Sequence, residues 1–85
     1  MRVEEEIRAK LTAAFAPDDL VITDDSERHR GHAGYRDGGQ THFHVRIRSG
    51  NFADMSRLER HRAVHAALGA ELTGRIHALA LTIEA

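Results

Sequence analysis

Residues 41–48 read THFHVRIR, and the alternation within this stretch decides the fold. Phe43, Val45 and Ile47 are apolar, whereas the positions between them carry histidine or arginine. A period of two, with one apolar and one polar side, is typical of a β-strand that buries one face. The Ser-Gly-Asn turn signal at residues 49–51 follows directly. We therefore predict a half-buried strand over residues 41–48.

The residues before this strand predict a helix and another strand. Pro17 follows the helical pattern and ends it, because proline cannot continue the hydrogen-bond ladder. Residues 20–23 form a short β-prone run, and a polar, glycine-containing loop over residues 27–39 follows. We expect the two strands to pair antiparallel across this loop. The apolar positions at helical spacing are Val3, Ile7, Leu11, Ala14 and Phe15.

The residues after this strand predict a second helix and a third strand. Ser56 and Glu59 match a capping box, in which each side chain bonds to the other residue's backbone amide. Gly74 has the character of a residue just beyond a helix end. Residues 77–83 alternate again and predict the third strand. The predicted inward side of the second helix consists of Leu58, His61, Val64, His65, Leu68 and Leu72.

The predicted order of elements is therefore α-β-β-α-β. A sheet of three strands needs its apolar face covered, and two helices on that face form a two-layer α+β domain. The 85 residues leave room for one domain only, so we predict a single domain over residues 1–85.

Composition excludes several classes of function. The chain has no cysteine, so it contains no disulfide, no thiolate nucleophile and no all-cysteine iron–sulfur site. Its net charge of −1 is not that of a typical nucleic-acid binder. It has no apolar run near the roughly 18 residues that span a membrane. No phosphate loop, nucleophile elbow or metalloprotease motif is present. We predict a cytoplasmic protein that is not an enzyme.

Several short stretches of the chain match one known family in their order and spacing. They are Asp24-Asp25-Ser26 with His29, Thr41-His42-Phe43 with Val45, Phe52, Ser56-Arg57, Arg60-His61-Arg62 with Val64, Glu71-Leu72, and residues 77–81, His-Ala-Leu-Ala-Leu. In these stretches the chain resembles the BolA family over nearly its full length. This resemblance implies a class II KH-like fold, which agrees with the predicted α-β-β-α-β order. It also implies a binding module that pairs with a monothiol glutaredoxin and shares a 2Fe–2S cluster with it and with glutathione, in iron–sulfur cluster trafficking or iron and redox regulation. A homodimer is compatible with it.

The resemblance also implies which histidines bind the cluster. His77 matches the family's ligand at the start of the last strand, and the second ligand comes from the loop, where His29 and His32 both qualify. Imidazole is a suitable ligand for iron. The partner and glutathione would supply the thiols that this chain lacks.

The remaining histidines have structural explanations. His61 and His65 lie four residues apart, but Arg62 stands where a zinc protease needs glutamate, so we expect both to pack at the edge of the core. We expect His42 to be structural and His44 to be a solvated residue on the outer strand face.

The family's second associated activity is transcriptional regulation through DNA binding. Arginines on one strand face and on the second helix offer a local basic surface for phosphate contact. A solvated charged face is the alternative interpretation, and the sequence alone favours it. The arginines concerned are Arg46, Arg48, Arg57, Arg60 and Arg62.

Overall fold

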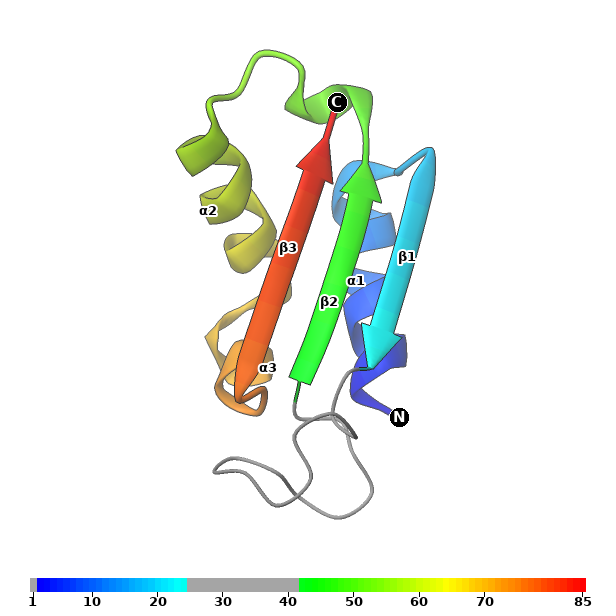
Figure 1. The fold of residues 1–85 in the computed structure, drawn as a ribbon, viewed down its shortest axis with the longest axis vertical. Helices are drawn as coiled ribbons and strands as arrows, with labels where there is room; N and C mark the ends of the chain where they lie inside the picture. The colour runs from blue at the N-terminus through cyan, green and yellow to red at the C-terminus, as the bar shows by residue number, and fades with distance from the viewer. Residues whose placement is uncertain (1, 25–41) are drawn as a thin grey trace.

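The computed structural model describes residues 2–24 and 42–85 as a two-layer α+β domain, which confirms the predicted fold class. All of the helices lie behind one face of the sheet, and the other face is open (Figure 1). The elements are α1 (Val3–Phe15), β1 (Asp19–Asp24), β2 (His42–Arg48), the short 3₁₀ helix η2 (Gly50–Phe52), α2 (Arg57–Leu68), α3 (Ala70–Gly74) and β3 (Ala78–Glu84).

The sheet has the strand order β1-β2-β3, with β2 in the centre. β1 runs antiparallel to β2, as predicted, and its Ile22 pairs with Val45. β3 runs parallel to β2 and pairs Leu81 with the same Val45. Parallel neighbours need a crossover connection, and η2, α2 and α3 provide it. The predicted central strand, which the structure describes over His42–Arg48, is thus the element to which both other strands are hydrogen-bonded.

The core lies between the sheet and the helices. The apolar side of β2 is fully covered, and the first helix buries one side chain per turn, as its spacing predicts. The rings of Phe15 and Phe52 pack with centroids 4.7 Å apart, and this contact joins α1 to η2. The buried apolar residues are Val3, Ile7, Leu11, Phe15, Ile22, Phe43, Val45, Ile47, Phe52, Val64, Leu68, Leu72 and Ile76.

The predicted second helix is interrupted, and this corrects one expectation. α2 ends at Leu68, and Gly69 has φ 84° and ψ 153°, a conformation that essentially only glycine adopts. The chain then restarts as α3, whose last residue is Gly74. The glycine that breaks the helical course is therefore Gly69, and the expectation that Gly74 lies beyond the end of one long helix is wrong.

The predicted capping box at the start of α2 is confirmed, but the prediction of which residues of this helix face inward is partly wrong. The backbone amide of Glu59 donates to the Ser56 hydroxyl at 3.1 Å, and the Ser56 amide donates to the Glu59 carboxylate at 2.8 Å. Leu58 is 57% exposed, whereas Val64 is buried. Six positions at about 100° per residue turn Leu58 roughly 120° away from Val64, which explains its exposure.

Ser49, directly after β2, is hydrogen-bonded to the end of α1. Its side chain is 2% exposed, and its hydroxyl donates to the Phe15 carbonyl at 2.8 Å. The Asn51 side-chain amide donates to the same carbonyl at 2.8 Å, and the Asn51 backbone amide donates to the Ser49 hydroxyl at 3.2 Å. The Ser49 backbone amide donates to the Glu84 carbonyl of β3 at 3.0 Å. One buried serine thus connects three elements.

Replacing Ser49 with alanine should lower the free energy of unfolding by about 1–3 kcal/mol, because buried partners lose their hydrogen bonds. Urea denaturation followed by circular dichroism measures this loss. Asn51→Ala is the comparison variant, and it should cost less because the exposed Asn51 side chain leaves water access to the carbonyl. A Ser49→Ala protein within about 0.5 kcal/mol of wild type, the range of ordinary surface changes, would contradict this account.

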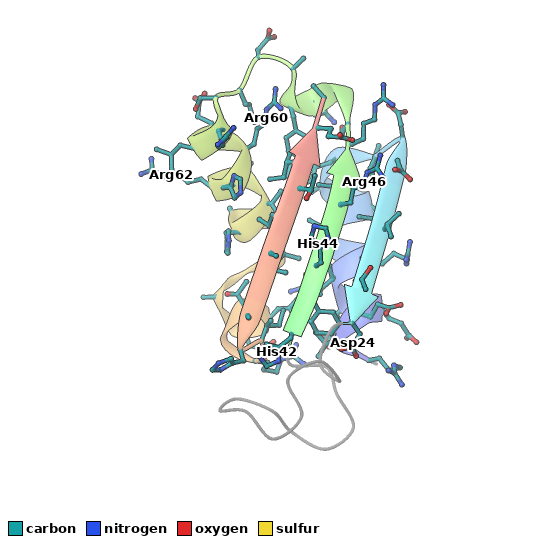
Figure 2. All side chains as sticks on the ribbon, viewed as in Figure 1. Asp24, His42, His44, Arg46, Arg60 and Arg62 are labelled. Atoms are coloured by element: carbon teal, nitrogen blue, oxygen red, sulfur yellow. The ribbon has the colours of Figure 1, made fainter. Side chains whose placement is uncertain are left out.

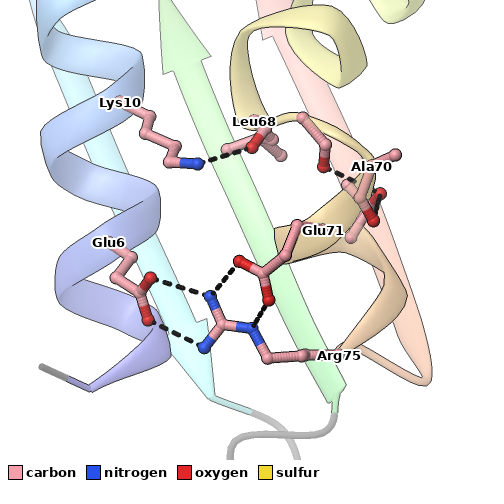
Figure 3. A network of polar contacts seen from close by, with 8 residues as sticks. Glu6, Lys10, Leu68, Ala70, Glu71 and Arg75 are labelled. Carbon is pink, nitrogen blue, oxygen red and sulfur yellow. Dashed lines mark hydrogen bonds and ion pairs between the residues drawn. The ribbon is translucent and has the colours of Figure 1, made fainter.

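Arg75 connects the first helix to α3 (Figure 3). Its guanidinium forms two hydrogen bonds to the Glu6 carboxylate, at 2.8 and 3.0 Å, and its Nε lies 2.7 Å from a Glu71 carboxylate oxygen. These hydrogen bonds from Arg75 hold the pKa of Glu6 below its ordinary value of 4.5. Nearby, the Lys10 ammonium donates to the Leu68 carbonyl at 3.0 Å, where α2 ends. The surface-side contacts between the helices are therefore largely ionic.

The lowered pKa of Glu6 gives stability a defined dependence on acid. The contribution of the Glu6–Arg75 pair to the free energy of unfolding is complete above the unfolded pKa of Glu6, near 4.5. It is lost as the pH falls through the lower pKa of Glu6 in the folded protein. Glu6→Gln should therefore flatten the decline of the melting temperature below about pH 4.5, measured by circular dichroism from pH 7 to 3.

Glu5→Gln is the control for this measurement, because Glu5 is exposed on the same helix and has no polar contact among the described residues. It should leave the shape of the curve unchanged. Identical curves for Glu6→Gln and wild type would show that the Arg75 pair does not stabilise the fold.

Candidate functional site

His77 stands at the end of the sheet where β3 begins. The preceding residue, Ile76, is buried, and its amide donates to the Thr73 carbonyl at 3.1 Å. The following residue, Ala78, pairs with His42 of β2. The backbone of His77 is therefore held on both sides, while its side chain is exposed.

His42 lies against His77. Because β2 and β3 are parallel, their first residues meet at the same end of the sheet, the end at which Figure 2 labels His42. The two imidazole rings have centroids 5.0 Å apart and planes inclined by 52°. His42 is only 3% exposed, so an accessible imidazole rests on a buried one. The expected structural role of His42 agrees with this burial.

The predicted loop ligands, His29 and His32, lie outside the described residues. The described chain stops at Asp24, the last residue of β1, and resumes at His42. Asp24 pairs with Phe43, so both attachment points of the intervening segment are at the same end of the sheet as His77. The choice between His29 and His32 stays a prediction.

The described residues do not form a self-contained metal site. Among residues 2–24 and 42–85, no group of three or more histidine, cysteine, aspartate or glutamate side chains could hold a metal ion. What this part of the chain offers is one exposed imidazole at the end of the sheet. A single imidazole can contribute to a metal group only if the other ligands come from elsewhere, and the ligand role of His77 stays a prediction.

The other described histidines have different surroundings. The His44 ring nitrogen lies 2.8 Å from the Thr82 hydroxyl on the open sheet face. His61 is half-buried, and its Nδ1 lies 3.0 Å from the Arg57 carbonyl of its own helix. His65 is exposed, so the expectation that it packs at the core edge is wrong. The reason is that Val64 and Leu68, rather than His65, face the sheet.

The strand arginines lie on a face whose charges are balanced. Arg46 projects from β2 on the open side of the sheet (Figure 2). Its Nε lies 3.6 Å from a Glu84 carboxylate oxygen and 3.9 Å from one of Asp19. Arg48 is paired in register with the same two acidic residues, one on each neighbouring strand. This face is therefore not the basic surface that the strand sequence alone suggests.

The arginines of α2 form a separate group. Arg60 donates from Nε to the Met55 carbonyl at 3.1 Å, which ties it to the preceding turn. Arg57 and Arg62 are exposed, and neither guanidinium group forms an ion pair or hydrogen bond among the described residues. Arg62 points outward from α2, whereas Arg46 lies on the open sheet face (Figure 2). The five arginines therefore do not gather into one patch.

Sequence reasoning missed two features of this region. The contact between His42 and His77 depends on β2 and β3 being parallel neighbours, and no local pattern shows which strands pair. The ion pairs of Arg46 depend on the register that places Asp19 and Glu84 opposite Arg48, two residues further along β2.

No described helix is long and apolar enough to cross a membrane.

The fold and this site define a small α+β domain with an exposed histidine at the start of its last strand. The family model of BolA-like proteins matches residues 11–85, and the chain therefore belongs to the BolA family.

Known relatives agree with this assignment. The chain is 47% identical over 79 residues to BolA-like protein 1 of Mus musculus, covering 93% of this chain but 55% of that protein. It is 41% identical over 81 residues to the DNA-binding transcriptional regulator BolA of Escherichia coli K12, covering 95% of this chain and 73% of that protein. The solved structure of BolA1 from Arabidopsis thaliana matches with a TM-score of 0.81 at 36% identity, covering 99% of this chain and 92% of that one.

Proposed function

We propose that this chain is a non-enzymatic BolA-type module that pairs with a monothiol glutaredoxin and shares a 2Fe–2S cluster with it. The observation that carries the proposal is the position of His77, an exposed imidazole on a fixed backbone at the family's ligand position. The process served would be iron–sulfur cluster trafficking or iron and redox regulation.

The composition of the chain supports a cluster that is shared with a partner protein rather than bound by this chain alone. There is no cysteine in the 85 residues, and the described part contains no group of three candidate metal ligands. Iron–sulfur clusters are usually held by cysteine thiolates, and histidine replaces cysteine in some of them. Glutaredoxin and glutathione would supply the thiols, and this chain would supply imidazole from His77 and from His29 or His32. Imidazole ligation would raise the reduction potential and make binding sensitive to pH.

The decisive experiment mixes the apo protein with cluster-loaded monothiol glutaredoxin and glutathione and records visible absorption and circular dichroism. Wild type should change the cluster spectrum, and His77→Ala should abolish that change because an iron ligand is lost. His29→Ala and His32→Ala, tested separately, should identify the loop ligand as the variant that behaves like His77→Ala.

His65→Ala is the matched control, since His65 is also exposed but lies on α2. It should behave like wild type. A wild-type protein that leaves the glutaredoxin spectrum unchanged would remove the proposal, and so would a His77→Ala protein that still changes it.

DNA binding is the second candidate, and two observations favour it. One relative is named a DNA-binding transcriptional regulator, and Arg57 and Arg62 are exposed cations on α2 without a described partner. Arg46 and Arg48 contribute less to this candidate, because Asp19 and Glu84 lie beside them. A DNA surface would therefore centre on α2 rather than on the sheet.

Gel shifts over a range of salt concentrations test this candidate. Replacing both Arg57 and Arg62 with glutamine should weaken binding and reduce the salt slope by about two, since each phosphate contact contributes roughly 0.9. Arg46→Gln is the control and should leave the slope unchanged, because its charge already faces two carboxylates. Absence of any shift at low salt would exclude DNA binding through this surface.

A further inference from the structure

The contact between His42 and His77 has a marked asymmetry of burial. His42 is 3% exposed, whereas His77, with its ring centroid 5.0 Å away, is exposed. A ring held among buried atoms keeps one rotamer, while an exposed histidine ring ordinarily samples several within nanoseconds. The buried ring can therefore limit the motion of the exposed one.

The backbone fixes the distance between the two residues. His42 is the first residue of β2 and pairs with Ala78, the residue directly after His77. The parallel ladder continues from this pair along the whole length of both strands to Arg48 and Glu84. The positions of the two Cα atoms are thus set by the sheet, and only side-chain rotation remains free.

We propose that His42 is a positioning residue for His77: its buried ring forms the surface against which the exposed imidazole packs, and this contact selects the rotamer in which His77 meets its ligand. The proposal rests on the proposed function for the identity of that ligand, a 2Fe–2S cluster presented by a glutaredoxin. The ring contact itself is independent of any ligand.

The geometry assigns this role to ring packing. The planes are inclined by 52°, a tilted arrangement of the kind that aromatic pairs favour. Residues that orient a metal ligand typically change metal affinity 10- to 100-fold when they are replaced. A phenylalanine at position 42 would preserve the flat ring, whereas alanine would leave the His77 ring without support on that side.

The first measurement needs neither metal nor partner. In wild-type protein with ¹³C-labelled histidine, the ring order parameter of His77 from NMR relaxation should be clearly higher than that of His65, an exposed histidine on α2. In His42→Ala the value for His77 should fall to the level of His65, and in His42→Phe it should stay near the wild-type value. His44→Ala, on the same strand but bonded to Thr82, should leave it unchanged.

The second measurement titrates the same variants against cluster-loaded glutaredoxin with glutathione and follows visible circular dichroism. His42→Ala should weaken the complex about tenfold or more, with a spectrum of altered shape, and His42→Phe should bind within a few-fold of wild type. Backbone amide spectra of each variant confirm that the fold is intact.

The outcomes separate this proposal from the proposed function. A His77 ring as mobile as that of His65 in wild type, or still ordered in a folded His42→Ala protein, would overturn the positioning role even if wild type binds the cluster. If His42→Ala does not fold, the positioning role is tested by the order parameter of the His77 ring in wild type and in His42→Phe, which should be high in both. A wild type that never changes the glutaredoxin spectrum would instead overturn the proposed function, while the NMR result would still show whether His42 orders His77.

Discussion

The parallel pairing of β2 with β3 is the constraint on which the rest of the structure depends. β2 alone carries hydrogen bonds to both neighbouring strands, and its apolar face is the most completely buried part of the sheet. The crossover that returns the chain to β3 delivers Leu68 and Leu72 to the core. It also ends beside the start of β2, which is why two histidines distant in sequence have rings in contact. The parallel pairing of β2 with β3 therefore both completes the sheet and brings the two histidines of the candidate site together.

Several charged side chains in this domain join its elements. Arg75 connects α1 with α3, and Arg46 lies between the acidic residues of the two outer strands. Exposed ion pairs of the latter kind add little stability, but they place two carboxylates near the arginines of the open sheet face. His77 lies at the end of the sheet, whereas the exposed Arg57 and Arg62 lie on α2. The two candidate functions therefore use separate surfaces.

Much of the fold follows from local patterns in the sequence. The alternation around Phe43 predicts β2, the spacing of Ile7 and Leu11 predicts α1, and the capping box at Ser56 marks the start of α2. The interruption at Gly69 was not predicted, because Leu68 and Leu72 keep helical spacing across it. Leu58 was assigned to the core because it is apolar, yet single exposed leucines are common on protein surfaces. These errors concern backbone conformation and helix rotation, which hydrophobic periodicity specifies only loosely.

The candidate site was predictable only in part. His77 could be identified as a candidate ligand from the family resemblance, and the structure shows that its side chain is exposed. The burial of His42 beneath it could not be foreseen, because it depends on which strands are neighbours and on their register. The same holds for Arg46, whose acidic neighbours come from opposite ends of the chain. Which distant residues are in contact depends on the order and register of the strands. The packing of all the elements together determines that order, and no local sequence pattern does.

The central position of β2 has a consequence for how the protein is made. The ribosome synthesises β2 long before β3, so a nascent chain that already contains β1 and β2 must expose the unpaired edge of β2 and much of its apolar face. Unpaired strand edges invite association with other chains. Ser49 cannot donate its amide to Glu84 until the last strand has been synthesised. The domain therefore acquires its complete sheet only after the crossover and β3 have been synthesised, and nascent chains are most exposed to aggregation while the crossover is being made.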